Sequence, residues 1–326
     1  QWHGMSRTGT LGRLFGHVPE PAVQMHPQDM QRRGLAEGDL VHITSKRGSI
    51  VVPVQPSTEL GLTQVFMGMH WGSEFLGGMS SSGERLGGVN AITTSAYCPG
   101  SKQPELKYAA VKVLKAELPW SLLAMAWLPE GDALTVRTQL RQAMDRFPFA
   151  TCVPFGRERS GVLFRAAAYE APPAETLAWL ETLLGLAGPD GIRYADARRG
   201  QRRAVRLSRQ GSQARLEAFL LAGDVRSQGW IKTLLQDELP AQDYGRLLLS
   251  PSAKPPIAVQ AKGQQVCTCF NVSEDVIKGT LARCHGSAEA RLSALQGELQ
   301  CGTNCGSCIP LLKRMVRESL PQAQAA

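Results

Sequence analysis

The fold and chemistry of the C-terminal region are decided by Val266-Cys-Thr-Cys-Phe-Asn-Val272 and, further along, Cys301-Gly-Thr-Asn-Cys-Gly-Ser-Cys-Ile-Pro310. Six of the eight cysteines of the chain lie from Cys267 onward. A Cys-x-Cys pair and a Cys-x-x-Cys pair each place two thiolates close together, and the chain between them can bring the pairs into contact. Four thiolates around one centre suit an iron–sulfur cluster or zinc, because both are soft-ligand sites.

Four cysteines are the predicted metal ligands. Gly306 lets the backbone bend between the last two of them, so that thiolates and nearby N–H groups can point inward. The helix that begins at Pro310 presents its positive end to the last ligand and favours the thiolate there. The four predicted ligands are Cys267, Cys269, Cys305 and Cys308.

The remaining cysteines are open to other interpretations. Cys284 is expected to be an ordinary buried or surface thiol, because free cysteine behaves as a small hydrophobe. Cys301 lies four residues before Cys305 and can exchange with it as a ligand. Disulfides are disfavoured, because cysteines as close as Cys267 and Cys269 cannot bond to each other without strain. Ahead of the cluster the chain holds only Cys98 and Cys152.

Length and composition indicate an ordinary globular chain of two or three domains. The 326 residues are 43% hydrophobic and 20% charged, and no apolar run approaches the ~20 residues of a membrane span. The chain begins at Gln1 without a methionine. We therefore expect it to be the back part of a longer protein, with any targeting segment upstream.

The net charge of +8 is concentrated between Arg193 and Arg215. One interpretation is the solvated face of a hairpin; the other is a docking surface that steers an acidic protein partner. Nucleic acid is not expected as a partner, because no aromatic residues are interleaved with the arginines.

Three regions and a linker follow from turn residues and periodicity. Residues 1–118 are expected to be β-rich, 119–250 to alternate strands and helices, 251–262 to be a Pro/Ser linker, and 263–326 to be helical between ligand loops. Ser273 is expected to cap a helix whose apolar face carries Val276, Ile277 and Leu281. The other expected elements are helices over 25–34, 132–147, 174–186, 230–235 and from Pro310, strands over 40–44, 49–54, 63–69, 161–168, 203–207 and 216–222, and a long loop over 72–101.

The cysteine region resembles a known family. Residues 266–312 look like the bacterioferritin-associated-ferredoxin type of [2Fe–2S] domain, a small helical module appended to assimilatory nitrate and nitrite reductases. The two cysteine pairs, Phe270-Asn-Val272 and Pro310 carry the resemblance. It implies a [2Fe–2S] cluster on the four predicted ligands.

The N-terminal region resembles a second family. The order Gln1-Trp-His-Gly-Met-Ser-Arg-Thr-Gly9, His70-Trp71-Gly72, Val89-Asn90 and Gln103-Pro-Glu-Leu-Lys107 is similar to the C-terminal molybdopterin-dinucleotide-binding domain of bacterial nitrate reductases, a double-psi β-barrel. Taken alone, the first stretch would be a plain surface loop, His70-Trp71 core packing and Lys107 a solvated charge. The resemblance implies that the pterin cofactor is contacted by Trp2, His3, Met5, Arg7, Thr8, Gly9, His70, Trp71, Asn90 and Lys107.

Two features limit what these resemblances imply for this chain. Relatives usually have Asp-Pro where this chain has Cys98-Pro99, so any role of that aspartate is in doubt here. The middle region resembles the small α/β module near the end of flavin-dependent reductases and nitrite reductases. It carries no flavin- or nucleotide-binding fingerprint, and we interpret it as a spacer or docking element.

Together the resemblances imply a multidomain, cytoplasmic assimilatory nitrate reductase, of which this is the C-terminal part. Electrons from a ferredoxin, a flavodoxin or an NADH-dependent reductase would pass through the [2Fe–2S] cluster. They would continue to a [4Fe–4S] cluster expected upstream and then to a molybdenum centre held by molybdopterin guanine dinucleotide (Mo-bis-MGD), where nitrate becomes nitrite. No candidate molybdenum ligand is visible in this sequence, so the chain alone is not expected to reduce nitrate. The alternatives are another molybdopterin oxidoreductase, such as a formate dehydrogenase, and a non-catalytic electron-transfer or iron–sulfur module.

Overall fold

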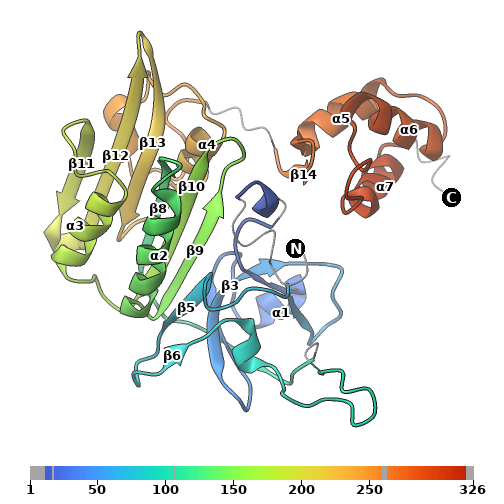
Figure 1. The fold of residues 1–326 in the computed structure, drawn as a ribbon, viewed down its shortest axis with the longest axis horizontal. Helices are drawn as coiled ribbons and strands as arrows, with labels where there is room; N and C mark the ends of the chain where they lie inside the picture. Colours follow the sequence, from blue (N-terminus) through green and yellow to red (C-terminus); the bar gives the residue numbers. More distant parts are fainter. Residues whose placement is uncertain (1–11, 17, 106–107, 259–262, 321–326) are drawn as a thin grey trace.

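The computed structural model describes residues 12–16, 18–105, 108–258 and 263–320. Two sheets lie side by side, and a small helical group stands beside them (Figure 1). Among the helices of the described ranges, none combines the length and the apolarity needed to cross a membrane.

The first sheet is built from the N-terminal region, in the order β4-β1-β3-β2-β7. The expected hairpin of two strands is confirmed as β2 and β3, paired antiparallel, whereas β1 runs parallel to β3. The short helix α1 (Pro27–Arg32) begins at the predicted proline, where the N of Gln28 donates to Nδ1 of His26 at 3.2 Å. The strands are β1 (Val23–Met25), β2 (Leu40–Thr44), β3 (Ser49–Pro56), β4 (Val65–Met67) and β7 (Lys112–Lys115).

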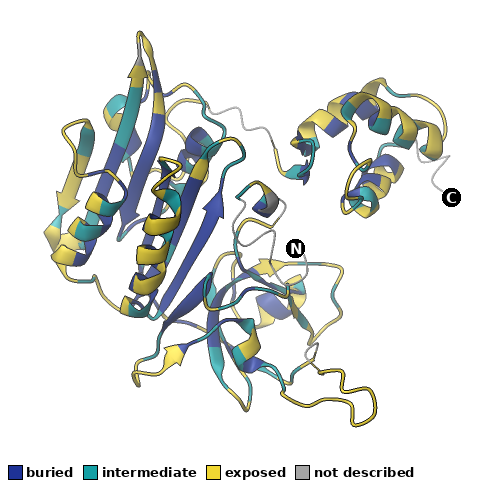
Figure 2. Ribbon diagram, viewed as in Figure 1, coloured by how far each residue is buried: buried dark blue, intermediate teal, exposed yellow. Residues whose placement is uncertain are grey.

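The second sheet is entirely antiparallel, in the order β11-β12-β13-β8-β10-β9-β5-β6. Its centre is buried on both faces, and Figure 2 shows β8, β9 and β10 buried along most of their length. The strands are β5 (Leu76–Met79), β6 (Arg85–Leu86), β8 (Trp120–Leu128), β9 (Phe149–Phe155), β10 (Ser160–Ala168), β11 (Gly191–Asp196), β12 (Gln201–Gln210) and β13 (Gln213–Ala222).

Helices cover both faces of this sheet. The apolar sides of α2 (Ala133–Ala143) and α3 (Ala174–Leu183) pack on alternate residues of β8, β9 and β10. On the other face, α4 (Gln228–Gln236) packs on β13, in a core cluster that also contains aromatic residues of the N-terminal region. Short 3-10 turns lie between these elements, at η2 (Gly12–Phe15), η3 (Val89–Ile92), η4 (Met144–Arg146), η5 (Ala197–Arg199) and η6 (Gly245–Leu249).

The second sheet crosses the predicted boundary at residue 118. The segment 72–101, expected to be a loop, contributes β5 and β6, and β5 pairs with β9 at Leu76↔Thr151. The close packing of β5 on the chain before β9 requires glycine at position 78, because a Cβ there would lie 2.5 Å from the carbonyl oxygen of Pro148. The N-terminal and middle regions therefore share one sheet. The double-psi arrangement and the domain limits remain predictions.

The C-terminal module comprises the hairpin β14 (Gln265–Cys267) and β15 (Val272–Ser273) and the helices α5 (Glu274–Arg283), α6 (Ala288–Leu299) and α7 (Ile309–Glu318). Its apolar side chains form a core of their own around Leu295 and Leu312. The expectations about α5 are met in part. Ser273 is the N-cap residue as predicted, but its hydroxyl makes no capping hydrogen bond. Val276 is 49% exposed, so Ile277 and Leu281 form the buried face.

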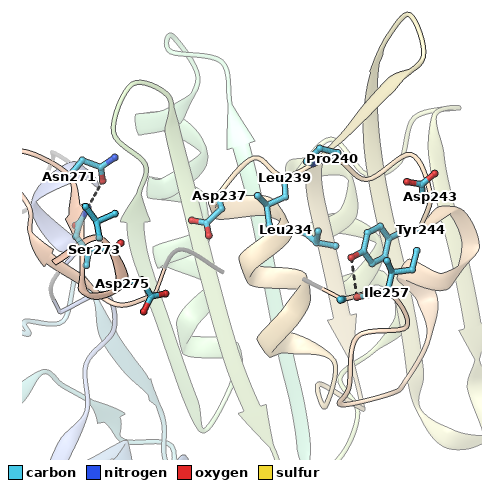
Figure 3. A pocket seen from close by; sticks show the side chains of 14 residues that line it. Leu234, Asp237, Leu239, Pro240, Asp243, Tyr244, Ile257, Asn271, Ser273 and Asp275 are labelled. Carbon is cyan, nitrogen blue, oxygen red and sulfur yellow. Dashed lines mark hydrogen bonds between the residues drawn. The ribbon is translucent and has the colours of Figure 1, made fainter. Parts of the chain in front are cut away.

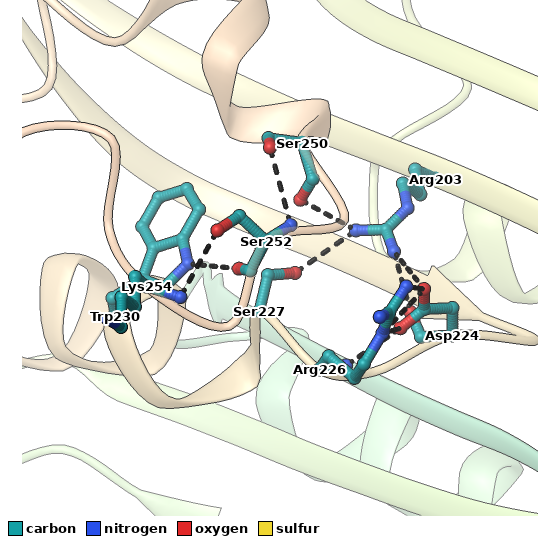
Figure 4. A network of polar contacts seen from close by, with 8 residues as sticks. All are labelled: Arg203, Asp224, Arg226, Ser227, Trp230, Ser250, Ser252 and Lys254. Atoms are coloured by element: carbon teal, nitrogen blue, oxygen red, sulfur yellow. Dashed lines mark hydrogen bonds and ion pairs between the residues drawn. The ribbon is translucent and has the colours of Figure 1, made fainter.

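The start of the predicted linker is bound to the middle region (Figure 4). Nη1 of the buried Arg203 donates to the carbonyl oxygen of Ser250 at 3.1 Å, and Nε1 of Trp230 donates to that of Ser252 at 3.0 Å. Further on, the hydroxyl of Tyr244 donates to the carbonyl oxygen of Ile257 at 3.2 Å. Residues up to Ile257 are therefore fixed on the same surface as α4.

Candidate functional site

The first cysteine pair lies at the turn of the β14–β15 hairpin. Cys267 ends β14 opposite Val272, and Cys269 follows in the turn. The turn closes at Asn271, whose φ of 55° is a left-handed conformation that asparagine tolerates. Nε2 of Gln265 donates to Oδ1 of Asn271 at 2.6 Å, which links the start of β14 to the end of the turn.

The second pair lies in the loop between α6 and α7. Gly302 and Gly306 have φ values of 85° and 73°, which favour glycine and let the loop double back. Cys305 is exposed on this loop, and Cys308 is buried at the N-cap of α7. The helix that the sequence places after Pro310 therefore begins directly after the last predicted ligand.

The fold brings the four predicted ligands together. Cys269 lies close enough to Cys305, and Cys267 close enough to Cys308, for the thiols to influence each other electrostatically, and Cys267 also acts on Cys269. Within the described part of the chain, no three His, Cys, Asp or Glu side chains cluster tightly enough to hold one metal ion. The four predicted ligands are thus neighbours across the two loops, and they do not surround a single point.

Burial and hydrogen bonding set the thiol acidities without any metal. Burial raises the pKa of Cys269 and, with the neighbouring Cys267, raises that of Cys308 to about 12. The Ser307 hydroxyl, 3.0 Å from Sγ of Cys305, lowers the pKa of that exposed thiol. A cationic centre nearby would be needed to keep the buried cysteines in the thiolate form.

Cys301 lies beside the pairs but has a partner of its own. Its buried thiol donates to the carbonyl oxygen of Leu295 at 3.7 Å, and burial raises its pKa. It is close enough to Cys267 and Cys308 to interact with both electrostatically. Cys284 occupies the C-cap of α5.

One contact to the Cys-x-Cys turn was not anticipated from the sequence. Arg157, in the hairpin that joins β9 to β10, donates to the carbonyl oxygens of Thr268 and Cys269. The only local signal was a charged turn between two apolar strands, which is common on protein surfaces.

Three of the residues predicted to contact the pterin lie near one another. Val89 N donates to the carbonyl oxygen of Trp71 at 2.9 Å, which holds the His70-Trp71 corner against the turn carrying the exposed Asn90. Trp71 is 1% exposed and packs edge-on to Phe75, with ring centroids 5.8 Å apart. Its indole is therefore part of the core, while the half-buried His70 has a φ of 74°.

The other predicted pterin contacts, Trp2, His3, Met5, Arg7, Thr8, Gly9 and Lys107, lie outside the described residues. The described chain begins at η2, where Phe15 packs against Trp71 with ring centroids 5.9 Å apart. The chain that follows the predicted cofactor loop is thus anchored at the His70-Trp71 corner. Cys98, in place of the usual aspartate, is exposed in a turn where its N donates to the carbonyl oxygen of Gln103 at 2.9 Å.

Several arginines of the basic segment hold the fold together. Nη2 of Arg193 donates to the carbonyl oxygen of Leu186 at 2.6 Å, near the end of α3. Nη2 of Arg202 donates to Glu181 at 2.7 Å, and Arg203 is buried against Asp224. These three charges are engaged inside the chain and contribute less to a docking surface than the sequence suggested.

A cleft of about 850 Å³ separates α4 and the loop after it from the start of the C-terminal module. Leu239 and Tyr244 form one wall, and Ser273 lies on the other (Figure 3). The carboxylates of Asp237, Asp243 and Asp275 line it. This charge is unfavourable for nitrate or for the phosphates of a dinucleotide.

Comparison with known proteins gives a family match for the N-terminal region. Residues 1–110 match the molydopterin dinucleotide binding domain family. The chain is also similar to a nitrate reductase from Klebsiella oxytoca, 29% identical over 335 residues that cover 99% of this chain and 33% of that protein. A nitrate reductase from Shewanella frigidimarina is 30% identical over 140 residues, which cover 36% of this chain and 14% of that protein.

The chain spans about a third of the length of the Klebsiella relative and a smaller share of the Shewanella one. The similarity to the first relative runs through the whole chain, including the middle region and the cysteine module.

Proposed function

We propose that this chain is the C-terminal part of a cytoplasmic, assimilatory nitrate reductase, in which electrons enter through a [2Fe–2S] cluster on Cys267, Cys269, Cys305 and Cys308. The whole enzyme would convert nitrate, two protons and two electrons to nitrite and water. The similarity to two nitrate reductases supports the reaction, and the family match supports a molybdopterin dinucleotide as the cofactor.

The proposal that electrons enter through a [2Fe–2S] cluster is supported by the arrangement of the four thiols. In a two-iron cluster each iron takes two protein thiolates, whereas a structural zinc ion takes all four ligands around one centre. Four neighbouring thiols from two loops, of which no three cluster tightly enough for one ion within the described residues, are consistent with the first arrangement. When bound, such a cluster would accept and pass on single electrons, and the chain would supply thiolates and backbone N–H groups around it.

The donor is proposed to be a ferredoxin, a flavodoxin or an NADH-dependent reductase subunit. Cys305 is exposed, so the proposed centre has a side open to a partner. The next carriers, a [4Fe–4S] cluster and molybdenum, would be held mostly by the part of the enzyme upstream of this chain. The N-terminal region would close over one dinucleotide arm of the cofactor.

The cluster is tested on the 326-residue chain, reconstituted anaerobically with iron and sulfide. We expect about two irons and two sulfides per chain, visible absorption, and an EPR signal in the reduced state. Cys267→Ser and Cys305→Ser should lose these signals, while the matched Cys284→Ser should keep them. A colourless chain that takes up one zinc ion on the same cysteines would refute the iron–sulfur proposal.

The enzyme part is tested separately on the full-length protein. Molybdenum and pterin analysis should find both, and reduced viologen should be oxidised when nitrate is added. Formate oxidation without nitrate reduction would replace the proposed substrate, and a protein without pterin would refute the enzyme proposal.

A further inference from the structure

The hairpin between β9 and β10 contacts the Cys-x-Cys turn of the C-terminal module. Nη1 of Arg157 donates to the carbonyl oxygen of Thr268 at 2.6 Å, and Nη2 donates to that of Cys269 at 2.7 Å. The two carbonyls belong to successive residues, so one planar guanidinium binds both. Arginine is suited to such a two-pronged contact because its donors lie in a fixed fork.

The hairpin holds this guanidinium in place. Gly156 has a φ of 100°, and a Cβ there would lie 2.4 Å from the Trp127 ring, so the turn packs tightly on the sheet below. Arg159 lies over the same ring, with its guanidinium 5.0 Å from a ring centroid, and forms an ion pair with Glu217. The residues on either side of Arg157 are therefore anchored to the core of the middle region.

A second contact lies next to the first. Gln265, at the start of β14, is so close to Gly16 that a Cβ at Gly16 would lie 1.6 Å from Oε1 of the glutamine. Gly16 follows η2, which is anchored at the Trp71 corner through Phe15. The Cys-x-Cys hairpin thus lies against the chain that leads from the predicted cofactor loop.

The contact also fixes the orientation of two peptide groups at the predicted ligands. In a planar trans peptide the N–H points opposite to the C=O. With both carbonyls directed at Arg157, the N–H groups of Cys269 and Phe270 point away from it. The guanidinium also places a positive charge at the backbone carbonyls of Thr268 and Cys269, and it lies 3.6 Å from the carboxylate of Glu158, which is 90% exposed. An ion pair this exposed is screened by water and is weak.

We propose that Arg157 is a positioning residue that docks the Cys-x-Cys turn onto the β9–β10 hairpin and raises the reduction potential of the centre held there. The proposal rests on the [2Fe–2S] cluster proposed above. Reduction adds a negative charge to the cluster, so a nearby cation stabilises the reduced form more than the oxidised form. Docking also holds the Cys-x-Cys turn close to the N-terminal region, which would bind the pterin.

The test is a redox titration of the reconstituted 326-residue chain, followed by EPR. In Arg157→Gln the equilibrium constant for one-electron reduction should fall about tenfold, which is about 59 mV for a one-electron couple. Arg157→Lys keeps the charge and should recover most of that shift. The matched control, Arg141→Gln, removes an exposed arginine from α2 and should leave the potential unchanged. Iron content is measured for each variant, because a merely structural role would lower the content without moving the potential.

Hydrogen exchange separates this proposal from the one on which it rests. In the apo chain, Arg157→Gln should speed the exchange of residues 264–272 at least several-fold, and the control should not. If the wild-type chain binds no iron, the cluster proposal fails, and this exchange comparison still tests the docking. Unchanged exchange in the apo variant overturns the docking, and an unchanged potential in a loaded variant overturns the tuning.

Discussion

Glu20 should carry much of the acid sensitivity of the two-sheet core. It lies before β1 with 18% of its side chain exposed, and it accepts hydrogen bonds from Nε of Arg165 at 2.8 Å and from Nζ of Lys232 at 2.6 Å. Burial opposes its ionisation, but the two cations outweigh burial and hold the pKa of Glu20 well below its usual value of 4.5. The carboxylate thereby joins the N-terminal segment to β10 and α4.

The magnitude follows from what Glu20→Gln leaves behind. Removing one partner of a fully buried ion pair costs about 3–5 kcal/mol. Arg165 and Lys232 are each 21% exposed, so water can solvate part of the charge that is left unpaired. We therefore expect a loss of about 2 kcal/mol at neutral pH. For a cooperative unit of this size that corresponds to a fall in Tm of about 4–8 °C.

The pH dependence gives a sharper check. Because the folded-state pKa is lowered, the stabilisation by Glu20 is complete above the unfolded pKa near 4.5 and is lost as the pH falls towards the folded value. Urea unfolding followed by tryptophan fluorescence should show the two proteins about 2 kcal/mol apart at neutral pH and nearly equal near pH 3. The control Glu158→Gln changes a side chain that is 90% exposed and should have no effect. A gap that stays constant from neutral pH to pH 3 would refute the reasoning.

Three further outcomes are expected. Trp71→Ala should destabilise the core by about 3–5 kcal/mol in urea unfolding, because it empties a site that is 1% exposed; a loss below ~1 kcal/mol would contradict the packing described. Arg203→Leu should cost about 1–3 kcal/mol, because the carbonyl oxygens of Asp224 and Ser250 lose their buried donor while the Asp224 carboxylate keeps its ion pair with Arg226. It should also speed exchange around Ser252, and equal exchange would argue against the linker contacts. Under native conditions iodoacetamide should alkylate Cys98, whose pKa is lowered by its hydrogen bond to Ser101, and the rate should rise with pH. Cys152 should be spared, because burial raises its pKa to about 12; mass spectrometry that finds it modified first would reverse this assignment.

Local signals in the sequence predict the elements that have one polar face. The hairpin of β2 and β3 follows from turn residues at 45–48, and α3 follows from apolar residues at helical spacing. β8 and β9 were not predicted. Both are buried on two faces, so their residues form continuous apolar runs without a period of two.

The glycine-rich segment 72–101 fails as a prediction for a different reason. Its strand β5 exists because β9 lies beside it, and a partner far away in the chain cannot be read from local propensity. The same limit applies to the site. Cysteine spacing alone predicts that Cys267, Cys269, Cys305 and Cys308 gather, whereas the contact from Arg157 joins residues more than a hundred positions apart.

The bound start of the linker limits how far the cysteine module can travel. Ile257 is held by Tyr244, and Gln264 accepts a hydrogen bond from the N of Glu274 inside the module. Even fully extended, the chain between these two points spans only about 25 Å. A tether this short keeps the detached module at an effective concentration of roughly millimolar near the hairpin. At that concentration the contact from Arg157 and the approach of Gln265 to Gly16 re-form readily if the module separates from the hairpin.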